Sequence, residues 1–330
     1  MSVNTTSELL NIGHDDAIAI KAPGRSPLSY AAIRSLSKRT QQSLSQAGIT
    51  KKDRVAIVLP NGPEMATAFV TISGASTTAP LNPAYRQEEF EFYLDDLKAK
   101  ALVVEAGSAS PAVAAAQKLG IPLINLVIDS SHAAGDFDLT FETTAPNAAA
   151  SNDAVDENDI ALILHTSGTT SRPKIVPLSH INVTSSAENI MNTLSLVPGD
   201  RCLNIMPLFH IHGLIATVLS SLRAGASIYC TPGFNALKYF SWMDDSKPTW
   251  YSAVPTMHQA ILTRAARSKD IIDAVPLRFI RSSSSPLPPQ VMAELENTFA
   301  APVIEAYGMT EAAHQMASNP LPPAVRKAGT

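Results

Sequence analysis

Short apolar runs bounded by turn residues alternate with longer segments of helical spacing along nearly the whole chain. Runs of this kind are typical of strands buried on both faces of a sheet. We predict strands at residues 55–59, 101–104, 160–164, 201–206, 227–230, 250–254, 278–282 and 302–306. The helical spacing predicts helices at residues 63–73, 87–97, 212–223, 255–267 and 288–299. The alternation indicates an α/β fold with mainly parallel sheets and helices on both faces.

This rhythm stops at residues 130–158, which are rich in Ala, Ser, Asn and acidic residues and show no sustained period. We predict a surface connection there, with a short strand at residues 137–141. The chain is therefore expected to divide into a first α/β subdomain with its connecting segment, residues 1–158, and a second α/β subdomain, residues 159–330. No fixed-period repeat is evident, which argues against a solenoid.

Composition narrows the class of protein. The 330 residues are 45% hydrophobic and 16% charged, and the formal net charge is −4 without any basic block. Nucleic acid or an anionic membrane is therefore disfavoured as the main partner, because both require clustered cations. No apolar run reaches the roughly 20 residues that span a bilayer, and the N-terminus lacks the features of a secretory signal. Two cysteines exclude a disulfide framework, so we expect a soluble intracellular protein.

The segment after the strand at residues 160–164 combines five hydroxyl side chains, one glycine and two cations. Converging hydroxyl and N–H donors, a close backbone approach and a cation are what phosphate oxygens require. The Walker pattern is absent, which disfavours a P-loop kinase. A solvated Ser/Thr loop is the alternative, but the density of donors favours a phosphate site. Its candidate residues are Thr166, Ser167, Gly168, Thr169, Thr170 and Lys174.

A second segment, residues 305–311, follows the last predicted strand and reads EAYGMTE. Its aromatic face can stack on a base, its hydroxyl can meet a phosphate, and its carboxylate can hold Mg²⁺ through one or two oxygens. Alone, such a tyrosine–glycine turn carries little weight. Together with the first segment it predicts a nucleotide site.

Both segments resemble nucleotide-binding motifs of the adenylate-forming enzymes, the superfamily of acyl-CoA synthetases, adenylation domains and luciferases. Residues 207–213, PLFHIHG, lie between them, where that superfamily has a Pro-x-x-His segment, and residues 28–30 and 79–83 resemble its upstream motifs. The resemblance implies the large N-terminal domain of the acyl-CoA synthetase fold. That domain would comprise two αβαβα subdomains, with the β-barrel subdomain incomplete and the C-terminal domain absent.

The resemblance also implies a reaction in which a carboxylate attacks the α-phosphate of ATP and the acyl group then passes to the thiol of coenzyme A. Tyr307 would lie against adenine, Thr310 would bond the α-phosphate, and His210 would orient the groups between adenylate and acid. Glu311 and Thr166 would hold Mg²⁺. The catalytic residues implied are His210, Thr310 and Glu311, and the ATP/AMP-binding residues are Thr166, Ser167, Gly168, Thr169, Thr170, Lys174, Glu305, Ala306, Tyr307 and Thr310.

The acid is expected to be small and polar. Relatives for aromatic or fatty acids have Gly- and Ala-rich sequence where this chain has four serines, and aromatic or small residues where it has His212 and His314. A second carboxylate in the acid would need such donors, because burying a charge without them is costly. The expected acyl pocket comprises His212, Ser282, Ser283, Ser284, Ser285 and His314. The alternatives are structural histidines and a serine turn in which Ser285 caps the next helix.

Residues 87–96, 277–282 and 314–322 also resemble the oxalate–CoA ligase group of plants and fungi. Oxalate is therefore the expected acid. A synthetase for another small or medium carboxylic acid, aromatic or fatty, and a non-catalytic nucleotide-binding module are the alternatives.

The same resemblance implies sequence beyond Thr330, including the catalytic lysine and the acid that binds ribose. We expect this chain to bind ATP or AMP and to adenylate poorly by itself. Relatives occur in the cytosol or in peroxisomes, and a peroxisomal C-terminal tripeptide would lie beyond Thr330.

Overall fold

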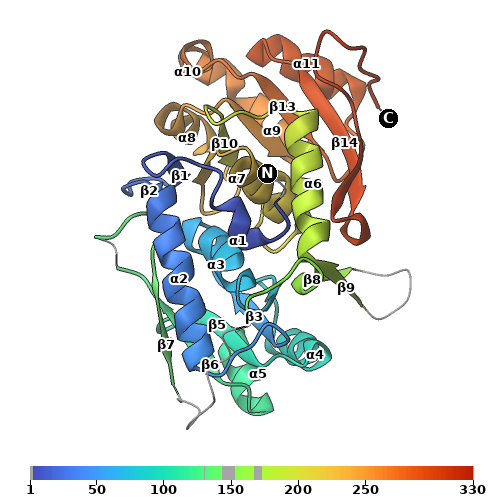
Figure 1. The fold of residues 1–330 in the computed structure, drawn as a ribbon. Coiled ribbons are helices and arrows are strands. Elements are labelled where there is room, and N and C mark those ends of the chain that lie inside the picture. The colour runs from blue at the N-terminus through green and yellow to red at the C-terminus, as the bar shows by residue number, and fades with distance from the viewer. Residues whose placement is uncertain (1–2, 130, 143–152, 167–172, 330) are drawn as a thin grey trace.

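The structure is a computed structural model that describes residues 3–129, 131–142, 153–166 and 173–329. Two mainly parallel sheets and three layers of helices make up the described fold, in the order helix, sheet, helix, sheet, helix (Figure 1). The predicted α/β class with helices on both sheet faces is confirmed. None of the described helices has the length and hydropathy of a membrane-spanning segment.

The first sheet has seven strands among the described residues, in the order β7-β6-β5-β3-β4-β8-β9. Its inner strands pair in parallel, while β7 and β9 pair antiparallel at the two edges. The strands are β3 (Arg54–Val58), β4 (Thr77–Pro80), β5 (Ala101–Glu105), β6 (Leu123–Val127), β7 (Asp138–Phe141), β8 (Ile160–Thr166) and β9 (Lys174–Ser179).

The second sheet has eight strands among the described residues, in the order β15-β14-β13-β12-β10-β11-β1-β2. It too is parallel inside, with antiparallel pairing at β2 and β15. The strands are β1 (Ile18–Lys21), β2 (Leu28–Ser29), β10 (Arg201–Asn204), β11 (Ser227–Cys230), β12 (Trp250–Ala253), β13 (Phe279–Ser282), β14 (Val303–Met309) and β15 (His314–Ser318).

The helices include most of those predicted from the spacing, and α3 and α4 have the predicted bounds. They are α1 (Thr6–Leu9), α2 (Tyr30–Gln46), α3 (Pro63–Ser73), α4 (Gln87–Leu97), α5 (Pro111–Leu119), α6 (His180–Thr193), α7 (Ser220–Arg223), α8 (Tyr239–Ser246), α9 (Pro255–Ala265), α10 (Lys269–Ala274) and α11 (Pro289–Phe299). Three short segments depart from α-geometry, namely the π-helix η1 (His212–Leu219) and the 3₁₀ turns η2 (Ala266–Ser268) and η3 (Thr310–Ala312).

Alternation along the strands divides the core into three parts. In β13, Phe279 packs into the core shared by both sheets, and Ile280 packs into the outer core beneath α9 and α11. Successive side chains of a strand point to opposite faces, so every inner strand contributes to two layers. The strands of the first sheet show the same alternation. In β3, Ile57 faces the shared core and Val58 faces the core beneath α4 and α5.

The two sheets exchange strands across the predicted boundary at residues 158/159. Strands β8 and β9 follow that boundary yet complete the first sheet, and β1 and β2 precede it yet belong to the second. Tyr30 illustrates the link, because its hydroxyl donates to the carbonyl of Ala226 at 2.7 Å. The division into two domains stays a prediction.

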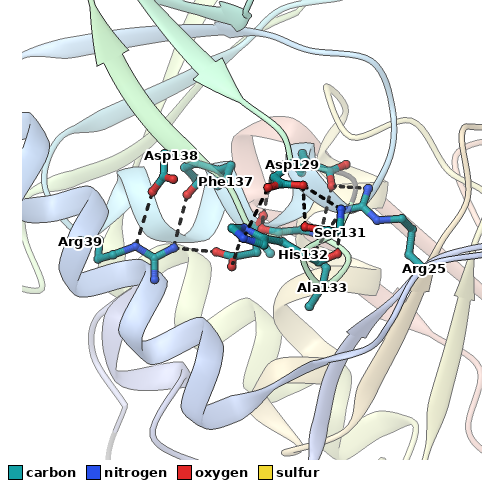
Figure 2. Close-up of polar contacts among 12 residues, drawn as sticks. Arg25, Arg39, Asp129, Ser131, His132, Ala133, Phe137 and Asp138 are labelled. Atoms are coloured by element: carbon teal, nitrogen blue, oxygen red, sulfur yellow. Dashed lines mark hydrogen bonds and ion pairs between the residues drawn. The ribbon is translucent and has the colours of Figure 1, made fainter.

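The segment that joins β6 to β7 is held against α2 and α3 by two arginines, as Figure 2 shows. Arg25 donates to the carbonyls of His132 and Ala133 at 3.3 and 3.1 Å. Arg39 pairs with Asp136 at 2.6 Å and with Asp138 at 3.8 Å. These contacts place β7 as an ordered edge strand within the predicted connecting region.

Candidate active site

The described members of the predicted site lie on β8 and β9 of the first sheet, on η1, and where β13 and β14 of the second sheet end. Ligands of open α/β sheets bind outside the carboxyl ends of the strands, so the location suits a substrate site. The 3₁₀ turn η3, which follows β14, lies against β9. Two segments more than 130 residues apart in sequence are thereby brought together, as the motif spacing led us to expect.

Strands β8 and β9 form the base of the predicted phosphate loop. Thr166 and Lys174 are paired across the antiparallel ladder, so the two strands leave the sheet side by side. Thr166 is half-buried, and Lys174 is exposed without a side-chain partner among the described residues. Four further candidates lie outside the described residues, namely Ser167, Gly168, Thr169 and Thr170. Phosphate binding here stays a prediction.

The residue before Thr166 was not among the candidates. His165 has its Nε2 3.1 Å from a carboxylate oxygen of Asp96, and its ring packs edge-on against Tyr93 with centroids 4.6 Å apart. Burial lowers the pKa of His165. The pair ties the end of β8 to α4.

The second predicted segment forms the hairpin of β14 and β15. Tyr307 is 59% exposed, so its ring face is free to receive a planar group. Glu305 is buried and accepts a hydrogen bond from the backbone N–H of Gly329 at 2.9 Å. The carbonyl of Ala306 accepts one from Ser283 Oγ at 2.8 Å. Tyr307 is thus presented outward, while Glu305 and Ala306 have structural partners.

Thr310 and Glu311 lie in η3, next to a cavity of about 370 Å³ between β9 and α6. Glu311 lines this cavity together with Pro177, Ser186, Asn189 and Gln315. Its carboxylate is exposed and has no hydrogen bond or ion pair among the described residues. A single carboxylate suits Mg²⁺, which usually keeps waters and substrate phosphates as its other ligands. Within the described part of the chain, no cluster of three His, Cys, Asp or Glu side chains is arranged for a metal.

The segment PLFHIHG forms a turn between β10 and η1, in which the backbone of Gly213 lies very close to that of Pro207. A Cβ on Gly213 would lie 2.4 Å from the carbonyl oxygen of Pro207, so only glycine permits this turn. His210 sits on the outside of the turn with its ring 4.5 Å from that of Phe209, and partial burial lowers its pKa. His212 begins η1 and points inward, where it is 2% exposed. π-Helical turns are frequent at functional sites.

His212 contacts two serines from neighbouring strand ends. Its Nε2 lies 2.6 Å from Ser252 Oγ and its Nδ1 lies 3.0 Å from Ser284 Oγ. The ring of His314 stands edge-on to it, with centroids 5.1 Å apart. The structure therefore brings together three members of the predicted acyl pocket: His212, Ser284 and His314.

The remaining serines occupy different environments. Ser282 is 1% exposed and its hydroxyl has no partner among the described residues, while Ser283 donates to the carbonyl of Ala306 on β14. Ser285 is exposed, and α11 begins at Pro289 without a side-chain cap, so the alternative in which Ser285 caps this helix is wrong. Substrate contact by any of these serines stays a prediction.

Both imidazoles in the pocket are neutral at physiological pH. Burial is the main cause that lowers the pKa of His212 and of His314 well below the usual value. The positive charge of Arg281 lowers both pKa values further. Sequence reasoning missed this arginine, although a cation inside the apolar strand segment RFIRS was a visible signal.

Comparisons with known proteins agree with this fold and site. Residues 12–330 match the family described as AMP-binding enzyme. The oxalate–CoA ligase of Arabidopsis thaliana is 42% identical over 312 residues, which cover 93% of this chain and 60% of that protein. The oxalate–CoA ligase of Saccharomyces cerevisiae is 39% identical over 303 residues, which cover 86% of this chain and 55% of that protein.

Among solved structures, the ATP-bound MatB from Rhodopseudomonas palustris superposes with a TM-score of 0.82 at 26% identity. The superposition covers 100% of this chain and 64% of that one. The chain thus spans about three fifths of the length of the proteins that it matches. With its layered α/β fold and the match over residues 12–330, this chain belongs to the AMP-binding enzyme family.

Proposed function

We propose that this chain is the ATP- and carboxylate-binding portion of an AMP-forming acid–CoA ligase, with oxalate as the acid. One observation carries the proposal. Lys174 and Glu311 lie on adjacent elements at the sheet edge, both exposed and both without a partner among the described residues. A cation and a carboxylate that are each left open on adjoining elements suit a nucleoside triphosphate with its divalent ion.

In the proposed reaction a carboxylate oxygen of the acid attacks the α-phosphorus of ATP, which forms an acyl-adenylate and releases pyrophosphate. The thiol of coenzyme A then attacks the acyl carbon, and AMP leaves as the thioester forms. Lys174 and the neighbouring hydroxyls hold the β- and γ-phosphates, Thr310 bonds the α-phosphate, and Tyr307 lies against adenine. Glu311 and Thr166 would hold Mg²⁺, which would supply charge neutralisation when bound.

The residues of the acyl side support a small acid with two acidic groups. Two neutral imidazoles and the Ser284 hydroxyl lie within one cluster beside a buried guanidinium. An apolar acyl chain would leave these polar groups without partners, which costs free energy. Oxalate–CoA ligases are also among the relatives. A ligase for another small or medium acid and a non-catalytic nucleotide-binding module are the competing functions.

We expect Lys174→Met and Glu311→Gln each to weaken ATP–Mg binding by about tenfold to hundredfold, because each removes a charge-assisted contact to the nucleotide or its ion. Isothermal titration calorimetry with ATP and Mg²⁺ measures the effect. Lys52→Met and Glu294→Gln are matched controls, since both side chains are exposed and lie on other elements. Unchanged affinity in both site variants would overturn the proposed nucleotide site.

The acid is identified by a panel of oxalate, acetate, benzoate and octanoate. We expect oxalate to bind most tightly in the presence of ATP and Mg²⁺, because only oxalate offers a second carboxylate to the polar cluster. Binding is followed by calorimetry, and pyrophosphate release is measured in parallel. A preference for benzoate or octanoate would favour the competing ligase, and ATP binding without any acid binding would favour the non-catalytic module.

A further inference from the structure

Arg281 is a charged side chain buried in the middle of the second sheet. It lies on β13 with 0% exposure and points to the shared core, as Phe279 does two residues earlier. Its Nη1 lies 3.4 Å from both His212 Nε2 and Ser252 Oγ, and its Nη2 donates to Gln315 Oε1 at 3.2 Å. Its Nε has no partner among the described residues. The guanidinium is held entirely by neutral groups.

No carboxylate compensates this charge. None of the ion pairs within the described residues includes Arg281. Burial lowers the pKa of Arg281 to about 10, which still leaves it protonated at neutral pH. Cys202 is close enough to act on it, but burial raises the pKa of this thiol, so it carries no charge. An unpaired buried cation is costly, and such a group is expected to meet an anion in the functional state.

The contacts of Arg281 favour one nitrogen of His212 as the site of the proton. A guanidinium can only donate, so Nε2, which faces it, is the unprotonated acceptor. The Ser252 hydroxyl is compatible with this assignment, because it can accept from Arg281 Nη1 at 3.4 Å and donate its own proton to Nε2 at 2.6 Å. The proton of the neutral imidazole therefore lies on Nδ1, from which it is donated to Ser284 Oγ at 3.0 Å.

Ser284 is consequently left with a free hydroxyl proton. Its backbone is in the left-handed region, with φ at 75°, and the residue is exposed, unlike its buried neighbours Ser282 and Ser283. A serine that accepts from His212 can donate its own proton outward, to a carboxylate oxygen. Arg281, Ser252, His212 and Ser284 thus form a chain of hydrogen bonds from the core to the site.

The surroundings of His212 are uniformly basic. The titratable groups that act on it are His314, Arg281, His258 and His210, and none is an acid. Several donors and a positive potential without a nearby carboxylate suit recognition of an anion.

We propose that Arg281 is a positioning residue of the acyl pocket: it fixes the His212 proton on Nδ1, directs the Ser284 hydroxyl outward, and supplies the charge that selects an acid with a second carboxylate. The substrate part of this inference rests on the proposed function. The effect on His212 does not, because it is present without any ligand.

The tautomer is measured by ¹⁵N NMR of the histidine-labelled, ligand-free chain, with His212→Asn assigning the signals. We expect one protonated nitrogen, Nδ1, in the parent and in Arg281→Lys. Arg281→Met should shift the proton toward Nε2 or give a mixture of tautomers. The guanidinium N–H that disfavours a proton on Nε2 is absent from this variant. An unchanged His212 in Arg281→Met, or Nε2–H in the parent, would overturn the positioning role.

Selectivity is measured by calorimetry with oxalate and acetate. Arg281→Met should weaken oxalate binding about tenfold to hundredfold and acetate binding far less. Arg281→Lys should recover much of the oxalate affinity because it keeps the charge. Equal losses for both variants would assign the effect to packing and overturn the charge role. Failure of the parent to bind oxalate would overturn the proposed substrate, and the NMR result would still decide the positioning role.

Arg201→Met is the matched control for loss of a partly buried arginine. Arg201 lies at the start of β10, at the other end of the sheet, where it donates to the carbonyl of Ser246 at 2.6 Å and to Ser227 Oγ at 3.2 Å. Its substitution should leave the His212 tautomer and the oxalate-to-acetate ratio unchanged. A ratio that falls equally in this control would overturn the assignment to Arg281.

Discussion

Gly308→Ala is expected to lower the free energy of unfolding by about 3 kcal/mol and to abolish measurable ATP binding. A Cβ on Gly308 would lie 1.7 Å from the carbonyl oxygen of His314 and 3.1 Å from its Nδ1. The first contact is with backbone, so β14 and β15 would have to separate. Tyr307 and Thr310 lie on either side of the altered position, and the separation would displace both.

Gly199→Ala is the matched control, because an added Cβ there meets nothing within 4 Å and the residue has no positive φ. It should change stability by less than about 0.5 kcal/mol. Denaturant unfolding measures both variants, and calorimetry with ATP measures binding. If Gly308→Ala matched the control in stability and bound ATP normally, the tight hairpin described here would be wrong.

Local pattern was sufficient for β3, β5, β8, β10 to β14, α3, α4, α9 and α11, whereas α2, α5, α6, β4, β6 and β15, among others, were not predicted. The bounds predicted for α3, α4 and β11 are those observed. Buried strands give continuous apolar runs, and the helices that cover them have apolar residues every three to four positions. Both patterns can be recognised in the local sequence. The residues of η1 and α7 were predicted as one helix, because a spacing pattern does not distinguish a π-helix from an α-helix.

Pairing between distant segments could not be predicted in the same way. Ile20 of β1 pairs with Ile228 of β11, more than 200 residues later, and nothing near Ile20 indicates which sheet it joins. Which sheet β1 joins depends on β11, because β11 must already be in place in the second sheet before β1 can pair with it. For the same reason the predicted boundary at residues 158/159 does not coincide with a division between the sheets.

The candidate site shows the same contrast. The motifs identified residues 305–311 and a candidate pocket that includes His212 and Ser284, because hydroxyls, glycines and histidines at strand ends are visible in the sequence, but they predicted neither β15 nor the contact between His212 and Ser284. Arg281 was missed because a lone cation in an apolar strand gives no sign of its partners. Its burial is set by Ser252, His212 and Gln315, which come from three other elements.

Lowering the pH from 7 to 5 is expected to destabilise the fold by about 4 kcal/mol through His180 and His258 alone. Burial lowers the pKa of each to about 4, against an ordinary value of 6.5. Below pH 6.5 the unfolded chain therefore binds more protons than the folded one. Stability falls as the pH decreases toward 4, by about 2 kcal/mol for each histidine at pH 5. His212 and His314 act in the same direction.

The two histidines can be separated by substitution, because each uses Nδ1. His180 Nδ1 accepts from the backbone N–H of Thr6 at 3.2 Å, and His258 Nδ1 lies 3.1 Å from the hydroxyl of Tyr251. Asparagine places an amide oxygen near that position and does not titrate. His180→Asn and His258→Asn should therefore lose stability at pH 7 yet each show a shallower decline toward pH 5.

Urea unfolding at a series of pH values measures these slopes, with exposed His14→Asn as the matched control. The control should retain the parent's change of stability with pH. The double variant should lose about twice as much of that change as either single variant, because the two sites lie on different elements and share no partner. A parent chain whose stability is flat between pH 7 and 5 would contradict the burial of neutral imidazoles. That result would also remove the basis for a neutral His212 in the acyl pocket, since the same desolvation keeps it uncharged.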